Sequence, residues 1–287
     1  MSRFKLAIVV LCVGALVACV TAGWAQEPPT YDIQKDTALY GNLNQNHIPI
    51  WGGVACGPTA AVNSFVYLQN AYPGLYNSSL INDADGDGVW NTYNDLRAVA
   101  QTLGGAAFMN TIANNTTWHD DFIWGKQAYI ESQVAGVTTY AAQDIWAWTN
   151  HAIPAWVSPV YPTWDFIYNE LEACEDVEIL LTWSDGGHYL TLTSFSWTDL
   201  DFDGIIDFNE ASIDYIDPWT GAWGQTNIWH AMVGDQWKIE TGYNTYAPWI
   251  SMAVSESPVP EPSALLVLGS GFVGIIGLAR RRLSKKV

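Results

Sequence analysis

The sequence predicts an α+β domain in which helices come first along the chain and an antiparallel sheet follows. In the first half, apolar residues recur at helical spacing, as in the segment 57–71. From residue 177 onward the apolar period changes to two, which is typical of strands. Helices followed by strands, rather than alternating with them, favour an α+β arrangement over a parallel α/β fold.

Local signals mark the ends of several expected elements. Pro73-Gly74 ends the first helix and Gly104-Gly105 ends the second. A Ser-Asp-Gly-Gly turn at 184–187 joins two strands. The expected helices cover residues 57–71, 91–103, 120–134, 142–148 and 164–174, and the expected strands cover 177–183, 188–197, 211–216 and 228–233.

Residues 1–26 have the features of a signal peptide. Two basic residues precede an apolar run at 6–17, and small residues follow, with cleavage expected after Ala22 or Ala25. The preceding Leu-Val-Ala-Cys sequence also matches a lipobox, in which Cys19 would be lipidated. Both processing routes remain open, and each implies an exported protein.

The last 29 residues, 259–287, combine three features in a fixed order. Val259-Pro260-Glu261-Pro262 precedes an uncharged apolar run at 263–279, and three arginines follow. The run is about 25 Å long as a helix, enough to cross a thin bilayer, and the basic cluster should stay cytoplasmic. This pattern resembles the PEP-CTERM sorting signal. The resemblance implies an exosortase-type sorting enzyme as partner, initial anchoring in the inner membrane, and delivery to the envelope or extracellular matrix of a Gram-negative bacterium.

The segment 27–258 between these tags is strongly acidic. It contains four basic and 28 acidic residues, which gives a formal charge of −24. Such a charge repels nucleic acid and anionic lipid, so neither is an expected partner of this domain. The acidity favours divalent cations instead. Sixteen tryptophans are spread along the chain; we expect them to pack the core, although exposed ones can stack on sugars.

Three residues have the chemistry of a nucleophilic site. Cys56 immediately precedes the expected helix 57–71, where unpaired N–H groups and the helix dipole lower a thiol pKa. His188 opens a strand and is the best candidate base, and Asp217 closes the next strand, where it can orient the imidazole.

Three short motifs carry a resemblance for this domain: Cys-Gly-Pro-Thr at 56–59 before a helix, Gly-His-Tyr-Leu from 187 on a strand, and Asp-Pro at 217–218. Together they resemble the papain-like cysteine peptidases of the bacteriocin-leader-processing type. The resemblance implies a two-lobe fold, with a helical first lobe and an antiparallel β second lobe, that hydrolyses peptide or protein substrates. By position, Cys56 is the nucleophile, His188 the base and Asp217 its orienter. The family's oxyanion-hole glutamine corresponds to Gln45, which lies eleven residues before the cysteine, farther than in the family.

Other interpretations of these residues stay open. Cys56 and Cys174 could form one disulfide after export. The domain could be a non-catalytic calcium-binding matrix or adhesion protein, or a transferase that uses the same Cys–His pair. The remaining histidines, His47, His119, His151 and His230, are expected to be structural or exposed.

The segment from Asp199 to Glu210 has the ligand spacing of an EF-hand calcium loop. Carboxylates fall at positions 1, 3, 5, 9 and 12, and Gly204 at position 6 allows the sharp turn. Because strands flank it, we expect an EF-hand-like Ca²⁺ loop inserted in a hairpin. The expected ligands are Asp199, Asp201, Asp203, the carbonyl of Ile205, Asp207 and Glu210.

A second acidic run shares the first half of this pattern. Asp83, Asp85 and Asp87 occupy positions 1, 3 and 5, but position 12 is Asn94 and Asp95 comes one residue late. We expect this run to bind Ca²⁺ more weakly than the first loop.

Overall fold

A computed structural model describes residues 27–49, 51–233 and 236–259. The expected signal peptide at 1–26 and the expected membrane helix at 263–279 lie outside these ranges. Inside them, none of the helices combines the length and apolarity that a bilayer span requires.

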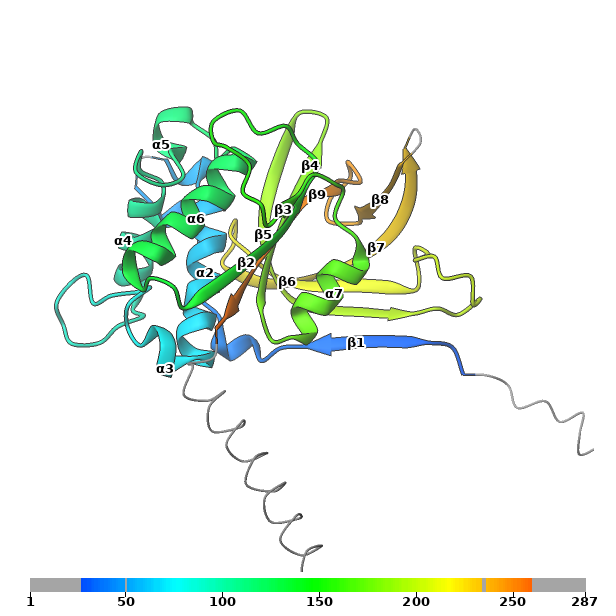
Figure 1. The fold of residues 1–287 in the computed structure, drawn as a ribbon, viewed down its shortest axis with the longest axis horizontal. Coiled ribbons are helices and arrows are strands. Elements are labelled where there is room, and N and C mark those ends of the chain that lie inside the picture. Colours follow the sequence, from blue (N-terminus) through cyan, green and yellow to red (C-terminus); the bar gives the residue numbers. More distant parts are fainter. Residues whose placement is uncertain (1–26, 50, 234–235, 260–287) are drawn as a thin grey trace, which may run out of the picture.

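Most helices gather on one side of the molecule and the strands on the other, with the helix at 164–172 on the strand side (Figure 1). The helices are α2 (Cys56–Ala71), α3 (Pro73–Tyr76), α4 (Tyr93–Leu103), α5 (Thr111–Asn114), α6 (His119–Gln133) and α7 (Trp164–Glu172), with 3-10 turns at Thr37–Leu39, Gln45–His47 and Gly52–Val54. The strands are β1 (Thr30–Gln34), β2 (Thr138–Asp144), β3 (Val157–Ser158), β4 (Asp176–Trp183), β5 (Gly186–Thr198), β6 (Ala211–Asp217), β7 (Ala222–Val233), β8 (Gln236–Thr241) and β9 (Trp249–Pro258).

The described strands form one mixed, largely antiparallel sheet of nine strands. Its order is β1-β5-β6-β7-β8-β9-β2-β3, and the pairing of β2 with β3 is parallel. β4 pairs with both β5 and β9, so the pairs from β4 through β9 close into a ring. The ring is joined between β8 and β9 at a single residue pair, Glu240 with Trp249. The sheet is therefore strongly curved, and it has two differently covered faces.

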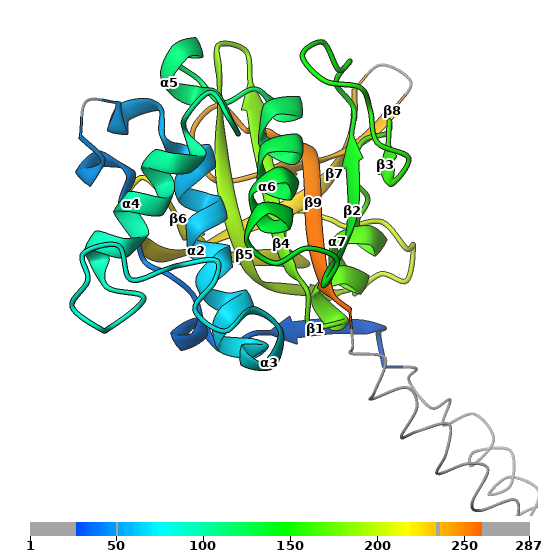
Figure 2. The ribbon, with the colours of Figure 1, turned by 60° about the vertical axis from the view of Figure 1, so that its left-hand side comes forward.

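One face of the sheet is covered by α2 and α6, which Figure 2 shows in front of the strands, and α4 packs against these two helices. α2 is buried along almost its whole length, because it lies between the other helices and the sheet. The opposite face is covered by α7 and has its own apolar core, which includes Ile167, Ile179 and Phe195. The central strands thus lie between two cores and are held rigidly.

A charged group lies inside the helix-covered side. The ammonium of Lys126 on α6 contacts the carboxylates of Asp176 at 3.1 Å and Glu178 at 2.5 Å, and it also contacts that of Glu256 on β9. Burial and the neighbouring Asp176 raise the pKa of Glu178 to about 7, against the opposing effect of Lys126. One cation from α6 therefore ties together two adjacent strands, β4 and β9.

Most of the expected elements are confirmed, but one expected helix is wrong. The segment 142–148 contains the end of β2 and a loop. Thr138, Thr139 and Tyr140 have high strand propensity, and Asp144 ends the strand by accepting a hydrogen bond from the backbone N–H of Trp146.

Five strands have no counterpart among the expected strands: β1, β2, β3, β8 and β9. β9 pairs with β4 and β2, yet its buried positions include Ser251, Ser255 and Glu256. Buried polar residues hide the apolar alternation that marks a strand. Since β1 and β2 come from the first half, the helices-then-strands order holds only for the main elements. The assignment to a papain-like two-lobe fold stays a prediction.

Candidate active site

Cys56, His188 and Asp217 come from three elements that meet at one end of the sheet. Cys56 is the first residue of α2, His188 is the third residue of β5 and Asp217 is the last residue of β6. β5 and β6 are antiparallel neighbours, so the start of one lies beside the end of the other.

A side-chain hydrogen bond fixes α2 against β5. The hydroxyl of Thr191 donates to the carbonyl of Ala60 at 2.9 Å. Thr191 is three residues after His188, and Ala60 is four residues, about one helical turn, after Cys56. The contact therefore sets the position of the thiol relative to the imidazole.

Asp217 holds the His188 ring. Nε2 of His188 lies 2.8 Å from Oδ1 of Asp217, so Nδ1 is the nitrogen left for the Cys56 side. The carboxylate also accepts the backbone N–H of Trp219 at 2.8 Å and the hydroxyl of Tyr243 at 3.0 Å. The Tyr243 ring lies 5.6 Å from the His188 ring, nearly parallel to it. The imidazole is thus oriented by a carboxylate that is itself held from two directions.

These contacts shift all three pKa values toward charged forms. Burial raises the pKa of the Cys56 thiol, but the hydrogen bond and positive charge of His188 outweigh it and lower that pKa. Burial lowers the pKa of His188, but hydrogen bonds with Asp217 and Cys56 raise it to about 9. Burial also opposes the charged form of Asp217, yet its bond to His188 keeps its pKa below the usual value. The arrangement therefore favours a thiolate–imidazolium pair over the neutral thiol and imidazole.

Gln45 lies between the loop that precedes Cys56 and the turn that follows Asp217. Its Nε2 donates to the carbonyl of Gly52 at 2.9 Å, and its backbone N–H donates to Pro218 at 2.8 Å. A Cβ on Gly52 would lie 2.4 Å from the Gln45 carbonyl, so only glycine permits this approach. The structure thus brings Gln45 to the loop before Cys56 and to the turn after Asp217. Its oxyanion-hole role stays a prediction.

The alternative of a Cys56–Cys174 disulfide is wrong. Both cysteines of the described segments are free. The carbonyl of Cys174 accepts the hydroxyl of Tyr72, which directly follows α2, whereas Cys56 starts that helix. The 16 residues of α2 span about 24 Å, several times the Cα separation that a disulfide tolerates.

A pocket of about 610 Å³ opens beside the thiol. A Cβ on Gly57 would lie 2.8 Å from the Thr117 side chain, so this glycine lets one pocket wall approach the start of α2. Trp118 and Trp146 at its rim are 54% and 40% exposed. The lining consists of Cys56, Thr116, Thr117, Trp118, His119, Trp146, Ala147, Thr149, Leu180, Thr182, Gly186, Gly187 and Tyr189. Its chemistry is mostly apolar and aromatic, with hydroxyls and one imidazole as polar groups.

His119, which the sequence did not single out, lines the same pocket as Cys56. Its Nδ1 lies 2.6 Å from Oδ2 of the fully buried Asp144. The same oxygen accepts the indole N–H of Trp148 at 2.8 Å. This second His–Asp pair had a weak sequence signal, because His119 directly precedes an expected helix start and Asp144 lies inside the wrongly assigned helix.

The loop between β5 and β6 gathers three of its expected calcium ligands. Carboxylate oxygens of Asp199, Asp201 and Asp203 lie within 4.8 Å of one another. Oxygens that share one Ca²⁺ at 2.3–2.6 Å lie at most about 5 Å apart, so this spacing fits the ion. Gly204 has a φ of +72°, which the sharp turn at position 6 requires.

Glu210 closes this loop. Its two carboxylate oxygens accept the backbone N–H groups of Leu200 at 2.8 Å and Asp207 at 3.2 Å. The last expected ligand is therefore folded back over the first residues of the loop. Asp207 and Glu210 lie outside the three-carboxylate group. The roles of all six expected ligands stay predictions.

The second acidic run is also folded as a tight loop. Asp83, Asp85 and Asp87 bring carboxylate oxygens within 4.8 Å of one another. Asn94 donates to Asp85 at 3.1 Å, but Asp95 forms a capping box with Thr92 at the start of α4. The other carboxylate oxygen of Asp95 accepts the backbone N–H of Ala84 at 2.7 Å, so this residue caps α4 and also folds back over the start of the loop.

Comparison with known proteins identifies the C-terminal segment. A family described as the PEP-CTERM protein-sorting motif matches residues 258–282. No curated protein matches this chain. PEP-CTERM motifs are recognised by exosortase-type sorting enzymes, and they direct bacterial proteins out of the cell and to its surface. The chain therefore carries the sorting motif of an exported bacterial surface protein.

Proposed function

We propose that this protein is an exported, papain-like cysteine peptidase that calcium stabilises. The observation that carries the proposal is the position of the His188 ring, between Cys56 and the Asp217 carboxylate 2.8 Å from Nε2. A lowered thiol pKa beside a raised imidazole pKa favours a nucleophilic thiolate. The adjoining pocket supplies space for a peptide side chain next to that thiol.

In the proposed reaction, the Cys56 thiolate attacks the carbonyl carbon of a peptide bond. The negative charge that develops on the carbonyl oxygen would be stabilised by the backbone N–H of Cys56 and the side-chain amide of Gln45. The His188 imidazolium gives its proton to the leaving amine, and a thioester remains. His188 then takes a proton from water, the hydroxide attacks the thioester, and the acid product leaves with the thiolate restored.

Asp217 keeps His188 in place through both steps. It accepts from Nε2, so the proton-transferring nitrogen is Nδ1. Tyr243 and the Trp219 backbone in turn hold the carboxylate. A correctly oriented imidazole is required because a small displacement of a reacting group costs much of the rate.

Calcium would stabilise the strands that carry His188 and Asp217 and would not act on the substrate. The acidic loop connects β5, which bears His188, to β6, which bears Asp217. Bound Ca²⁺ would neutralise carboxylates of Asp199, Asp201 and Asp203 that otherwise repel one another. The hairpin that carries the base and its orienter would then be more rigid.

One observation favours the alternative of a non-catalytic calcium-binding matrix or adhesion protein. The Nε2 group of Gln45 already donates to Gly52, so the proposed oxyanion donor is partly occupied. A transferase using the same thioester would replace water with another nucleophile, and it shares the first chemical step.

The test is peptide hydrolysis by the purified chain in calcium. Wild-type protein, Cys56→Ala, His188→Ala and the control Cys174→Ser are incubated with a mixture of synthetic peptides, and products are identified by mass spectrometry. The proposal requires cleavage by the wild type and Cys174→Ser, and none by the first two variants. Equal cleavage by Cys56→Ala would reject it, and folded wild type that cleaves nothing would favour the matrix protein.

The protein would be anchored in a membrane before it is sorted to the surface. We infer that the apolar run at 263–279 first anchors the chain in the inner membrane of a Gram-negative cell. Deleting residues 259–287 should then release the domain in soluble form. Retention of the truncated protein in the membrane fraction would point to lipidation at Cys19.

A further inference from the structure

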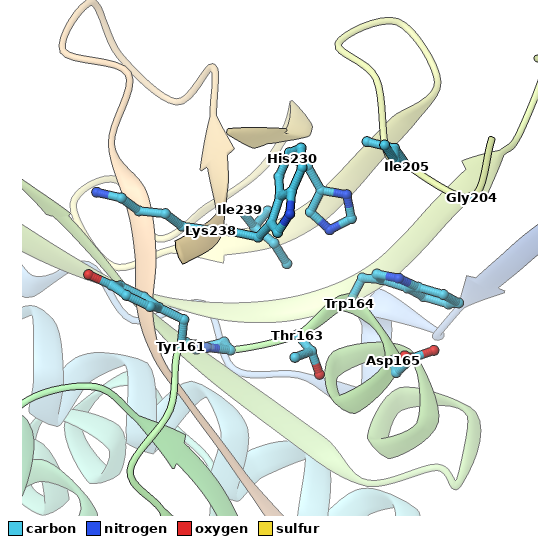
Figure 3. Close-up of a pocket in the computed structure, with 11 residues that line it drawn as sticks. Tyr161, Thr163, Trp164, Asp165, Gly204, Ile205, His230, Lys238 and Ile239 are labelled. Atoms are coloured by element: carbon cyan, nitrogen blue, oxygen red, sulfur yellow. The ribbon is translucent and has the colours of Figure 1, made fainter. Parts of the chain in front are cut away.

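A second pocket lies away from the Cys56 site and shares no lining residue with it. Its volume is about 340 Å³. Figure 3 shows one wall formed by the segment 161–165, which leads into α7, and an opposing wall that includes His230 of β7 and Ile239 of β8. Ile205, from the acidic loop, lies at one end. Segments far apart in sequence thus build this pocket together.

Three large aromatic side chains line this pocket. Tyr161, Trp164 and Trp237 all contribute, and Trp237 is 50% exposed although it is large and apolar. An exposed indole at a concave site offers a flat face for stacking together with an N–H donor. The C–H face of a pyranose ring packs well against such a surface.

His230 supplies a hydrogen-bond donor of known tautomer. The backbone N–H of Ile206 donates to Nδ1 of His230 at 2.9 Å, and the backbone N–H of His230 donates to the Ile206 carbonyl at 2.8 Å. Because Nδ1 accepts a hydrogen bond, the ring proton of the neutral imidazole is on Nε2. The opposite wall includes the exposed carboxylate of Asp165, an acceptor. A donor on one wall and an acceptor on the other suit a ligand with several hydroxyl groups, because each hydroxyl both donates and accepts.

The charge of the site argues against an anionic ligand. The ammonium of Lys238 already lies 3.9 Å from the centre of the Trp249 ring, so it is engaged within the protein. The domain's formal charge of −24 repels polyanions. An uncharged, hydroxyl-rich molecule matches both the aromatic surface and the electrostatics.

We propose that this pocket binds a neutral saccharide, with Trp237 as the stacking platform and His230 Nε2 as a hydrogen-bond donor. Binding here is independent of peptide hydrolysis, since the site shares no residue with the Cys56 pocket. A protein sorted to the cell surface would thereby attach to, or act beside, a glycan.

The test is titration of the full chain with neutral hexasaccharides of β-1,4-linked glucose, mannose and xylose. The protein is purified in a detergent without a sugar headgroup, and every solution contains calcium so that the acidic loop is in one state. Calorimetry should show saturable binding of at least one hexasaccharide. Trp237→Ala should weaken that binding about tenfold or more, and His230→Phe, which keeps a ring without the donor, should also weaken it.

The matched control is Trp223→Ala, because Trp223 is 53% exposed but does not line this pocket. It should bind like the wild type. Absence of saturable binding of every hexasaccharide up to about 10 mM would overturn the proposal, as would unchanged binding by Trp237→Ala. Binding of decaproline without any saccharide binding would also overturn it, because aromatic grooves accept such peptides.

Discussion

The Nε2 atom of His188 and the Oδ1 atom of Asp217 lie 2.8 Å apart although 29 positions separate them in the chain. Antiparallel pairing of β5 with β6 produces this contact, because it places the start of one strand beside the end of the other. The chain between the two strands carries the acidic loop. The geometry of the proposed base is therefore linked to whatever that loop binds.

Peptidase activity should fall above about pH 9. The imidazolium of His188 has its pKa raised to about 9, so the proton needed by the leaving amine is present below that pH and lost above it. The pH profile of kcat/KM should show this alkaline limb. Asp217→Asn should shift the limb to lower pH and reduce kcat, because the carboxylate that stabilises the imidazolium is gone. If the alkaline limb did not shift in Asp217→Asn, Asp217 would not be the residue that stabilises the His188 imidazolium.

The same pKa shift predicts a loss of stability at alkaline pH. The folded-state pKa of His188 is raised above the usual value near 6.5, so its stabilising contribution is complete below that value and disappears as pH rises through about 9. In the wild type the lowered pKa of Cys56 offsets this loss, so the comparison is made without the thiol. Thermal unfolding between about pH 6 and pH 9 should show a larger decrease in Tm for Cys56→Ala, in which Asp217 still raises the pKa of His188, than for Cys56→Ala with His188→Gln. Identical decreases in the two proteins would contradict this linkage.

Calcium should stabilise the domain through the loop between β5 and β6. At about a hundredfold excess over Kd, a ligand that binds the folded state alone adds about 2.7 kcal/mol to the free energy of unfolding. Glu210→Gln should remove most of the calcium-induced rise in Tm, whereas Glu172→Gln, at an exposed glutamate on α7, should not. Chelation should also lower any peptidase activity. Calorimetry without a calcium-binding signal for the wild type would reject this role.

Replacing Lys126 should destabilise the fold strongly. Lys126→Met leaves Asp176, Glu178 and Glu256 buried without their cation, and removing one partner of a buried ion pair costs about 3–5 kcal/mol. Chemical denaturation should measure this loss. Adding Glu256→Gln to Lys126→Met should recover part of it, since one buried charge is removed. A loss under about 1 kcal/mol for the single variant would show that the carboxylates are neutral in the folded protein.

The sequence predicted the parts of the fold whose signals are local. Period-two alternation identified β4 and β5, and helical spacing identified α2, which places Cys56 at a helix start. β9 could not be recognised, because its buried Ser251, Ser255 and Glu256 are stabilised by partners distant in sequence, such as Lys126. Contacts with distant parts of the chain, rather than the local sequence pattern, determine that such a segment forms a strand.

The residues of the candidate site were likewise predictable only where a local sequence signal marks them. Cys56, His188 and Asp217 occupy element ends that the sequence marks, so their chemistry was predictable. Tyr243, which donates to Asp217 from the segment after β8, carries no local sign of that role. His119 joins the Cys56 pocket only because α6 and β2 meet there, with Asp144 fully buried beneath it.

The most direct measurement of the central claim is the rate of alkylation of Cys56 at low pH. Wild-type protein is treated with iodoacetamide at about pH 6, well below the pKa of a free thiol, and the two sites are followed by peptide mapping. The Cys56–His188 pair should make Cys56 react ahead of the more exposed Cys174, and His188→Ala should abolish that preference. If Cys174 reacts first in the wild type, or if Cys56 reacts equally fast without His188, the thiolate–imidazolium pair does not exist.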